Sequence, residues 1–158
     1  MAASPLRAHL DALFAYDAWA NARVADALRA GPPLPRALRL FAHITKGSEA
    51  WLGRVREQDT VKDVWPDTPE AIDVEVSAAR AEANARAWRA LLRDADDLDR
   101  LIPHHNFAGQ YFEVPLARIA THVANHGTYH RGQIALLLRD AGAEPPVTDF
   151  SAYARAHP

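Results

Sequence analysis

Three histidines spaced four residues apart are the clearest chemical feature of the sequence. They are His122, His126 and His130, within the segment THVANHGTYHRGQ. Residues four apart lie on the same side of an α-helix, so each H-x3-H pair has the geometry to bind one metal ion. The spacing therefore indicates a divalent-metal site, with two possible pairs of ligands.

The apolar positions around these histidines help to choose between the two pairs. At about 100° per residue, His130 lies about 20° from the centre of the apolar stripe, His126 about 60° and His122 about 100°. The stripe itself consists of Leu116, Ile119, Val123, Ile134 and Leu137. This favours His126 with His130 as the pair that faces inward. The alternative is that they are packed, hydrogen-bonded core histidines, although two stacked buried imidazoles would both need partners for their nitrogens.

Asp17 is a second candidate for a functional role. It lies within about 40° of Leu13 on the apolar stripe of its own predicted helix, and a carboxylate that faces a core is costly unless it is paired. We expect one of two environments. Either Asp17 accepts a hydrogen bond from a ligand imidazole, which we favour, or it forms a buried ion pair with an arginine such as Arg131.

Four long segments are predicted to be helices that carry these residues. Proline-bearing breaks separate them, and alanine raises helix propensity throughout. The segments are about residues 5–29, 35–57, 68 to 94–99, and 115–141. The third is expected to begin at Thr68-Pro69-Glu70, and Gly142 to follow the fourth as its C′ residue. Residues 104–114 are expected to form a short hairpin, and residues 147–158 a tail that wraps the body.

These elements predict an all-α fold, a four-helix bundle with a longer connection between the third and fourth helices. Residues 1–158 form one domain in this interpretation, and an α-solenoid is disfavoured because no internal period is present. No apolar run reaches ~18 residues, and the N-terminus has no signal-peptide pattern, so we expect a cytoplasmic protein. A net charge of −2 argues against a nucleic-acid partner. The absence of cysteine excludes disulfides and cysteine nucleophiles.

Three motifs resemble those of the DinB/YfiT-like family of metal-dependent proteins. The segment NHGTYHRGQ, residues 125–133, is similar to the family signature N-H-x3-H-R-G-Q. Residues 14–21, FAYDAWAN, resemble the first-helix motif Y-N-x-W-x-N, with aspartate where the family usually has asparagine. Residues 43–54, HITKGSEAWLGR, resemble the second-helix motif. The likeness covers most of the chain in the same order.

The resemblance implies a bundle that holds one metal ion with a histidine of the second helix and two of the fourth. Carried over, these ligands are His43, His126 and His130. His43 itself lies about 100° from Ile44, on the flank of its apolar stripe. Further candidates near the metal or in a substrate pocket are Asp17, Asn125, Arg131, Gln133 and His122. His104 and His105 are extra candidate ligands or substrate contacts, and for these two and His122 an ordinary structural role is favoured. Zinc or nickel is the expected metal, with iron or copper as alternatives.

Three neutral imidazoles leave a divalent ion with an open coordination position, which is typical of catalytic sites. The resemblance implies an S-transferase that joins a low-molecular-weight thiol to an electrophile. The alternatives are a metal-dependent hydrolase and a non-catalytic metal-binding protein of the stress response, since the family is associated with DNA-damage-inducible genes. A homodimer is also expected from the likeness.

Overall fold

The structure, a computed structural model, describes residues 4–58, 63–106 and 108–157 of the 158-residue chain. Its four long helices are α1 (Pro5–Ala30), α2 (Pro35–Val55), α3 (Val74–Asp94) and α4 (Leu116–Asp140). Helices α1 and α2 begin at residues whose chemistry favours a helix N-terminus. Proline occupies the first turn of α1 and α2, and the Ser4 hydroxyl accepts from the backbone N–H of Arg7.

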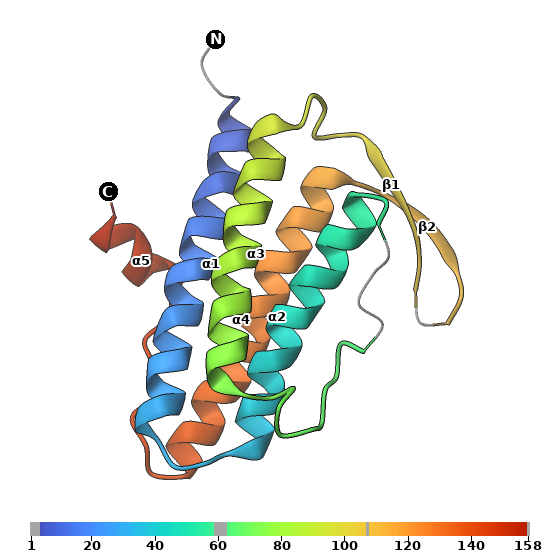
Figure 1. The fold of residues 1–158 in the computed structure, drawn as a ribbon. Coiled ribbons are helices and arrows are strands. Elements are labelled where there is room, and N and C mark those ends of the chain that lie inside the picture. Colours follow the sequence, from blue (N-terminus) through green and yellow to red (C-terminus); the bar gives the residue numbers. More distant parts are fainter. Residues whose placement is uncertain (1–3, 59–62, 107, 158) are drawn as a thin grey trace.

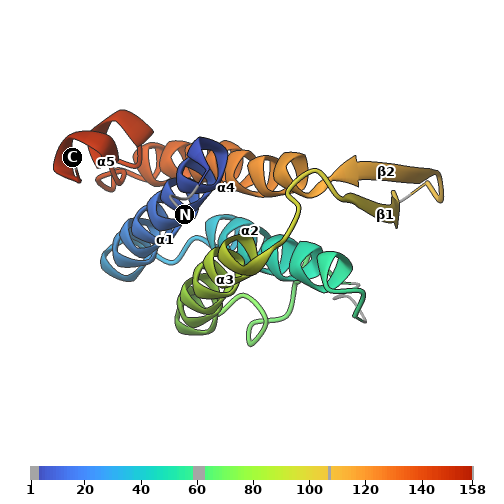
Figure 2. The ribbon, with the colours of Figure 1, turned by 90° about the horizontal axis from the view of Figure 1, so that it is seen from above.

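The helices form the expected all-α four-helix bundle (Figure 1). α1 packs mainly against α3 and α4, and α2 packs mainly against the same two helices. Seen from above, the hairpin that joins α3 to α4 extends away from the helices (Figure 2). Its antiparallel strands are β1 (Leu101–His105) and β2 (Tyr111–Pro115), which confirms the predicted hairpin and pairs His104 with Phe112.

The predicted start of the third helix is wrong by five residues. Thr68 begins only an isolated turn, in which the backbone N–H groups of Ala71 and Ile72 donate to its carbonyl. The turn is not continued because Asp73 takes an N-cap conformation, with φ −60° and ψ 134°. Its carboxylate accepts from the backbone N–H groups of Glu75 and Val76, so α3 begins there instead.

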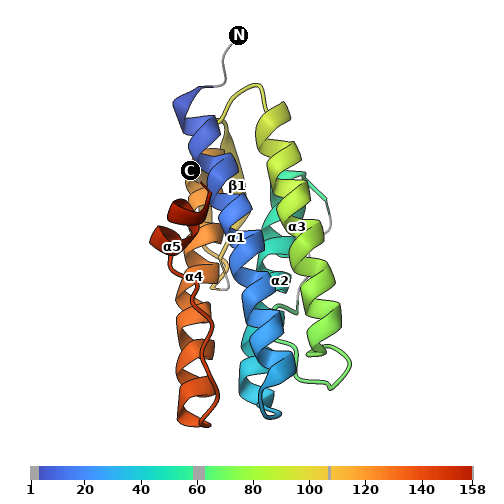
Figure 3. The ribbon, with the colours of Figure 1, turned by 90° about the vertical axis from the view of Figure 1, so that its left-hand side faces the viewer.

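The C-terminal tail contains a helix that the sequence patterns did not predict, α5 (Phe150–Ala156). Figure 3 shows it against the outer side of the bundle, next to α1. Tyr16 of α1 makes edge-on contacts with Phe150 and Tyr153, and its hydroxyl donates to the carbonyl of Thr148. Gly142, with φ 76°, follows α4 as predicted.

The core consists of two apolar clusters separated along the bundle axis by buried polar side chains. One cluster includes Phe14 stacked on Trp88, and the other includes Phe41 and Ile134. The polar side chains between them come from all four helices: Asp17, Asn21, Thr45, Ser48, Asn84, His130 and Arg131. Because buried polar groups must be hydrogen-bonded, this layer is where a site or a structural network is expected. Within the described residues, no helix combines the length and apolarity needed to cross a membrane.

Candidate metal centre

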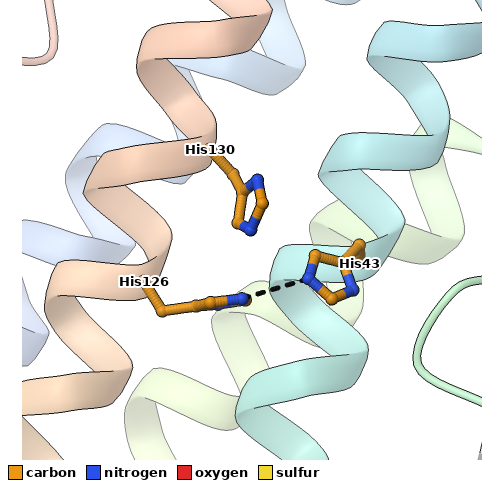
Figure 4. A group of neighbouring side chains, drawn as sticks. All are labelled: His43, His126 and His130. Atoms are coloured by element: carbon orange, nitrogen blue, oxygen red, sulfur yellow. Dashed lines mark hydrogen bonds between the residues drawn. The ribbon is translucent and has the colours of Figure 1, made fainter.

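Three histidines from two helices converge at one point of this polar layer. His43 of α2 and His126 and His130 of α4 each offer a ring nitrogen, and these atoms all lie within 4.8 Å of one another. Figure 4 shows the three rings facing a common space between the two helices. His43 and His130 are buried, and His126 is partly buried. The structure thus brings together the three residues that the motifs implied, including His43, which its own helical position left in doubt.

The Nε2 atoms of His43 and His126 are 3.0 Å apart. Two imidazole nitrogens bound to one tetrahedral zinc at 2.0–2.1 Å are about 3.3 Å from each other. The observed separation is therefore close to that of a shared ion. In the absence of an ion, one of these nitrogens must carry a proton and donate to the other, because two lone pairs at this distance repel.

Two of the three rings are oriented by a hydrogen bond on the side away from the cluster. His43 Nδ1 donates to the backbone carbonyl of Val64 at 2.6 Å, and His130 Nδ1 donates to Oε1 of Gln133 at 2.8 Å. A proton on Nδ1 leaves the Nε2 lone pair of each ring directed into the cluster. Metal-binding histidines almost always have such a partner, which fixes the tautomer and raises the basicity of the ligand.

Burial also favours the neutral, metal-binding form of His43 and His126. It lowers the pKa of His126 to about 3, with further contributions from charge on His130, His43 and His122. The pKa of His43 is lowered as well, chiefly by burial, although its bond to Val64 works in the opposite direction. Protons therefore compete poorly for these two nitrogens at neutral pH. The donor set fits a divalent ion such as zinc or nickel.

A cavity of about 350 Å³ opens beside the cluster. His43 and His126 form part of its wall, and Trp51, Trp65 and Arg54 form other parts. It is also lined by Gly47, Ala50, Val64, His104, His105, Asn106 and His122. His43 and His126 are therefore accessible to a small molecule, as a catalytic site requires and as a sealed structural site would not provide.

Asp17 forms a buried ion pair with Arg131, the second of the two environments expected for it. Its Oδ1 accepts from Nη1 of Arg131 at 2.5 Å, its Oδ2 accepts from Asn21, and no described histidine donates to it. Burial alone would lower the pKa of Arg131, but the charge and hydrogen bond of Asp17 raise it above its ordinary value. The favoured expectation, a hydrogen bond to a ligand imidazole, is therefore corrected to a buried ion pair with Arg131.

Of the other candidate residues, one orients a ring of the cluster, one lies at the surface and one lines the cavity. Gln133 orients His130, as described above, whereas the exposed Asn125 lines a separate hollow with Tyr16 and Phe150. His122 lies outside the cluster with its ring edge against Trp51, and it lines the cavity together with His104 and His105.

Two important residues of the site carried no predicted role. Trp65, in the connection between α2 and α3, stacks on His43 with ring centroids 3.5 Å apart and planes at 9°. Gly47 lies where α2 approaches α4, and a Cβ there would lie 3.3 Å from Cε1 of His126. A glycine inside a helix lowers helix propensity and often marks a close approach, so Gly47 could have been recognised. Trp65 lies in an irregular segment, where periodicity gives no signal.

Comparisons with known proteins agree with this picture. Residues 8–158 match the model of the DinB family. Over 157 residues the chain is 24% identical to the protein named Protein DinB of Bacillus subtilis (strain 168), covering 89% of this chain and 91% of that protein. No solved structure matches the chain.

Proposed function

The chain belongs to the DinB family, and from this premise and the histidine cluster we propose that it is a metal-dependent S-transferase. It would join a low-molecular-weight thiol to an electrophile. The observation that carries the proposal is the convergence of three imidazoles beside an open cavity. A divalent ion held there would lower the pKa of a coordinated thiol, as it does for coordinated water.

The protein's own residues would position the ion and shield the site. His43, His126 and His130 would hold the ion, while Val64 and Gln133 keep two of the rings in the binding tautomer. The indole of Trp65 covers one face of His43, and Trp51 provides an apolar wall to the cavity. The chain has no cysteine, so the sulfur must come from a second reactant.

In the overall reaction the thiol loses its proton to solvent and a new S–C bond forms. The leaving group departs from the electrophile with the bonding electron pair. The alternative use of the same site is hydrolysis, in which water takes the place of the thiol. These two reactions differ in whether turnover requires an added thiol.

The test uses zinc- or nickel-loaded protein, monochlorobimane as the electrophile, and glutathione, bacillithiol and mycothiol as thiols. We expect fluorescent thioether to form above the uncatalysed rate with at least one thiol. The rate should be lost in His126→Ala and kept in His9→Ala, a matched change at an exposed histidine of α1. Turnover of an ester or amide substrate without thiol would favour the hydrolase instead. A metal-loaded protein inactive in both assays would favour a binding protein.

A further inference from the structure

Among the described residues, the permanent charge that lines the cavity beside the histidine cluster is positive only. None of the described residues that line it is acidic, whereas Arg54 is a permanent cation. A divalent ion in the cluster would add further positive charge at one end. A pocket lined in this way favours an anion over a neutral or cationic molecule.

Arg54 is the permanent charge in this pocket. Its guanidinium lies over the ring of Trp51, with Cζ 4.6 Å from the ring centroid. The side chain is partly buried, and burial lowers the pKa of Arg54. Among the described residues, no carboxylate forms an ion pair with it, in contrast to Arg29, Arg89 and Arg131. A partly buried guanidinium facing a cavity is suited to bind a carboxylate in bidentate fashion.

Trp51 organises this end of the pocket. Its ring contacts the guanidinium of Arg54 on one side and the edges of His104 and His122, with centroid distances of 5.0 and 5.6 Å. These side chains come from α2, from strand β1 and from α4. Three separate elements thus converge on one end of the cavity.

Arg54 and the histidine cluster lie at different levels of the same helix. A Cβ on Gly47 would lie 3.3 Å from Cε1 of His126, and the backbone of Arg54 is seven residues further along α2, a helical rise of about 10 Å. A ligand that reached both would be an extended molecule with its carboxylate and its reacting atom at opposite ends.

We infer that Arg54, supported by Trp51, His104 and His122, forms a carboxylate subsite in the cavity that is also lined by His43 and His126. The inference rests on the proposed function, because it assigns a substrate class to the same pocket. The natural reactants are then an extended thiol or electrophile with a terminal carboxylate, rather than a small neutral molecule.

The test compares ligands that differ only in their ends, with affinity for zinc-loaded protein measured by calorimetry. The probe is ω-mercaptooctanoate, whose flexible chain places the carboxylate up to about 10 Å from the sulfur. Its neutral counterpart is ω-mercaptooctanol, and octanoate is the thiol-free counterpart. We expect the acid to bind roughly tenfold or more tightly than the alcohol. This preference should disappear in Arg54→Gln and persist in Arg56→Gln, an exposed arginine two residues further on.

The outcomes separate this inference from the proposed function. Equal binding of acid and alcohol, or a preference that survives in Arg54→Gln, would overturn the carboxylate subsite. In a third outcome, the preference for the acid depends on Arg54, but octanoate binds as tightly as the mercapto acid. That result would support the subsite and count against a thiol held by the histidine cluster.

Discussion

Arg131 of α4 and Asp17 of α1 form a buried ion pair, and Arg131 directly follows the proposed metal ligand His130 in the sequence. Their Nη1 and Oδ1 atoms are 2.5 Å apart, and the side chains are 1% and 9% exposed. Asn21 and Thr128 complete the network, each through a hydrogen bond to the guanidinium. The pair thus joins two helices within the polar layer that also contains the histidine cluster.

Asp17→Asn should reveal this pair as a structural element. The change leaves the buried guanidinium without its counter-charge, so we expect the free energy of unfolding to fall by about 3–5 kcal/mol. Zinc affinity should change little, because Asp17 contacts none of the three histidines. Asp11→Asn is the matched control on the same helix. It breaks an exposed pair with Arg89, for which a loss of no more than about 1 kcal/mol is expected. Unchanged stability in Asp17→Asn, or a tenfold loss of zinc affinity, would contradict this assignment.

Gly127 provides the space that the ion pair occupies. A Cβ at this position would lie 2.8 Å from both Nη1 of Arg131 and Oδ1 of Asp17. Gly127→Ala should therefore destabilise the protein, by about 1–3 kcal/mol, in spite of the better helix propensity of alanine. Gly132→Ala in the same helix meets nothing within 4 Å and should stabilise by about 0.5–1 kcal/mol. Chemical denaturation of both variants measures the difference, and the same sign for both would refute the steric argument.

Gln133 should act on the metal through His130. Replacing it with leucine removes the acceptor for His130 Nδ1 and keeps a similar volume. We expect zinc affinity to fall by roughly tenfold or more, with the helical signal intact. Competition with a chromophoric chelator provides the measurement. Wild-type affinity in Gln133→Leu would show that this hydrogen bond does not tune the site.

The bundle should fold without its metal. The two apolar clusters lie on either side of the polar layer and contain none of the three histidines. Chelation is therefore expected to lower the melting temperature while the far-UV helical signal at 25 °C is kept. The stabilisation lost is about 3 kcal/mol for zinc held about a hundredfold above its Kd. Unfolding on chelation would identify the centre as structural and weaken the S-transferase proposal.

The sequence predicted most of the fold because each helix carries its own apolar stripe and end signals. The start of α3 was misplaced because Thr68 and Asp73 are both good N-cap residues, and only the local backbone selects between them. In α4, periodicity was sufficient to place His126 and His130 inward. His43 lay on the flank of its stripe, and the family resemblance was needed to include it.

Contacts between elements account for what the sequence did not reveal. The pattern of α1 showed that Asp17 faces inward, but the partner depends on which helix packs beside it, and this proved to be α4 with Arg131. The stacking of Trp65 on His43 depends on the path of an irregular connection. The position of Arg54 in the cavity likewise becomes apparent only when β1 and α4 are placed around α2.

The metal content of the purified protein and its histidine variants tests the central claim most directly. Mass spectrometric elemental analysis after zinc or nickel loading should give one ion per chain for the wild type. His43→Ala, His126→Ala and His130→Ala should each lose most of it, whereas His122→Ala, which changes a histidine of the same helix outside the cluster, should retain it. Near-full occupancy in His126→Ala, or no bound metal in the wild type, would contradict the proposed centre.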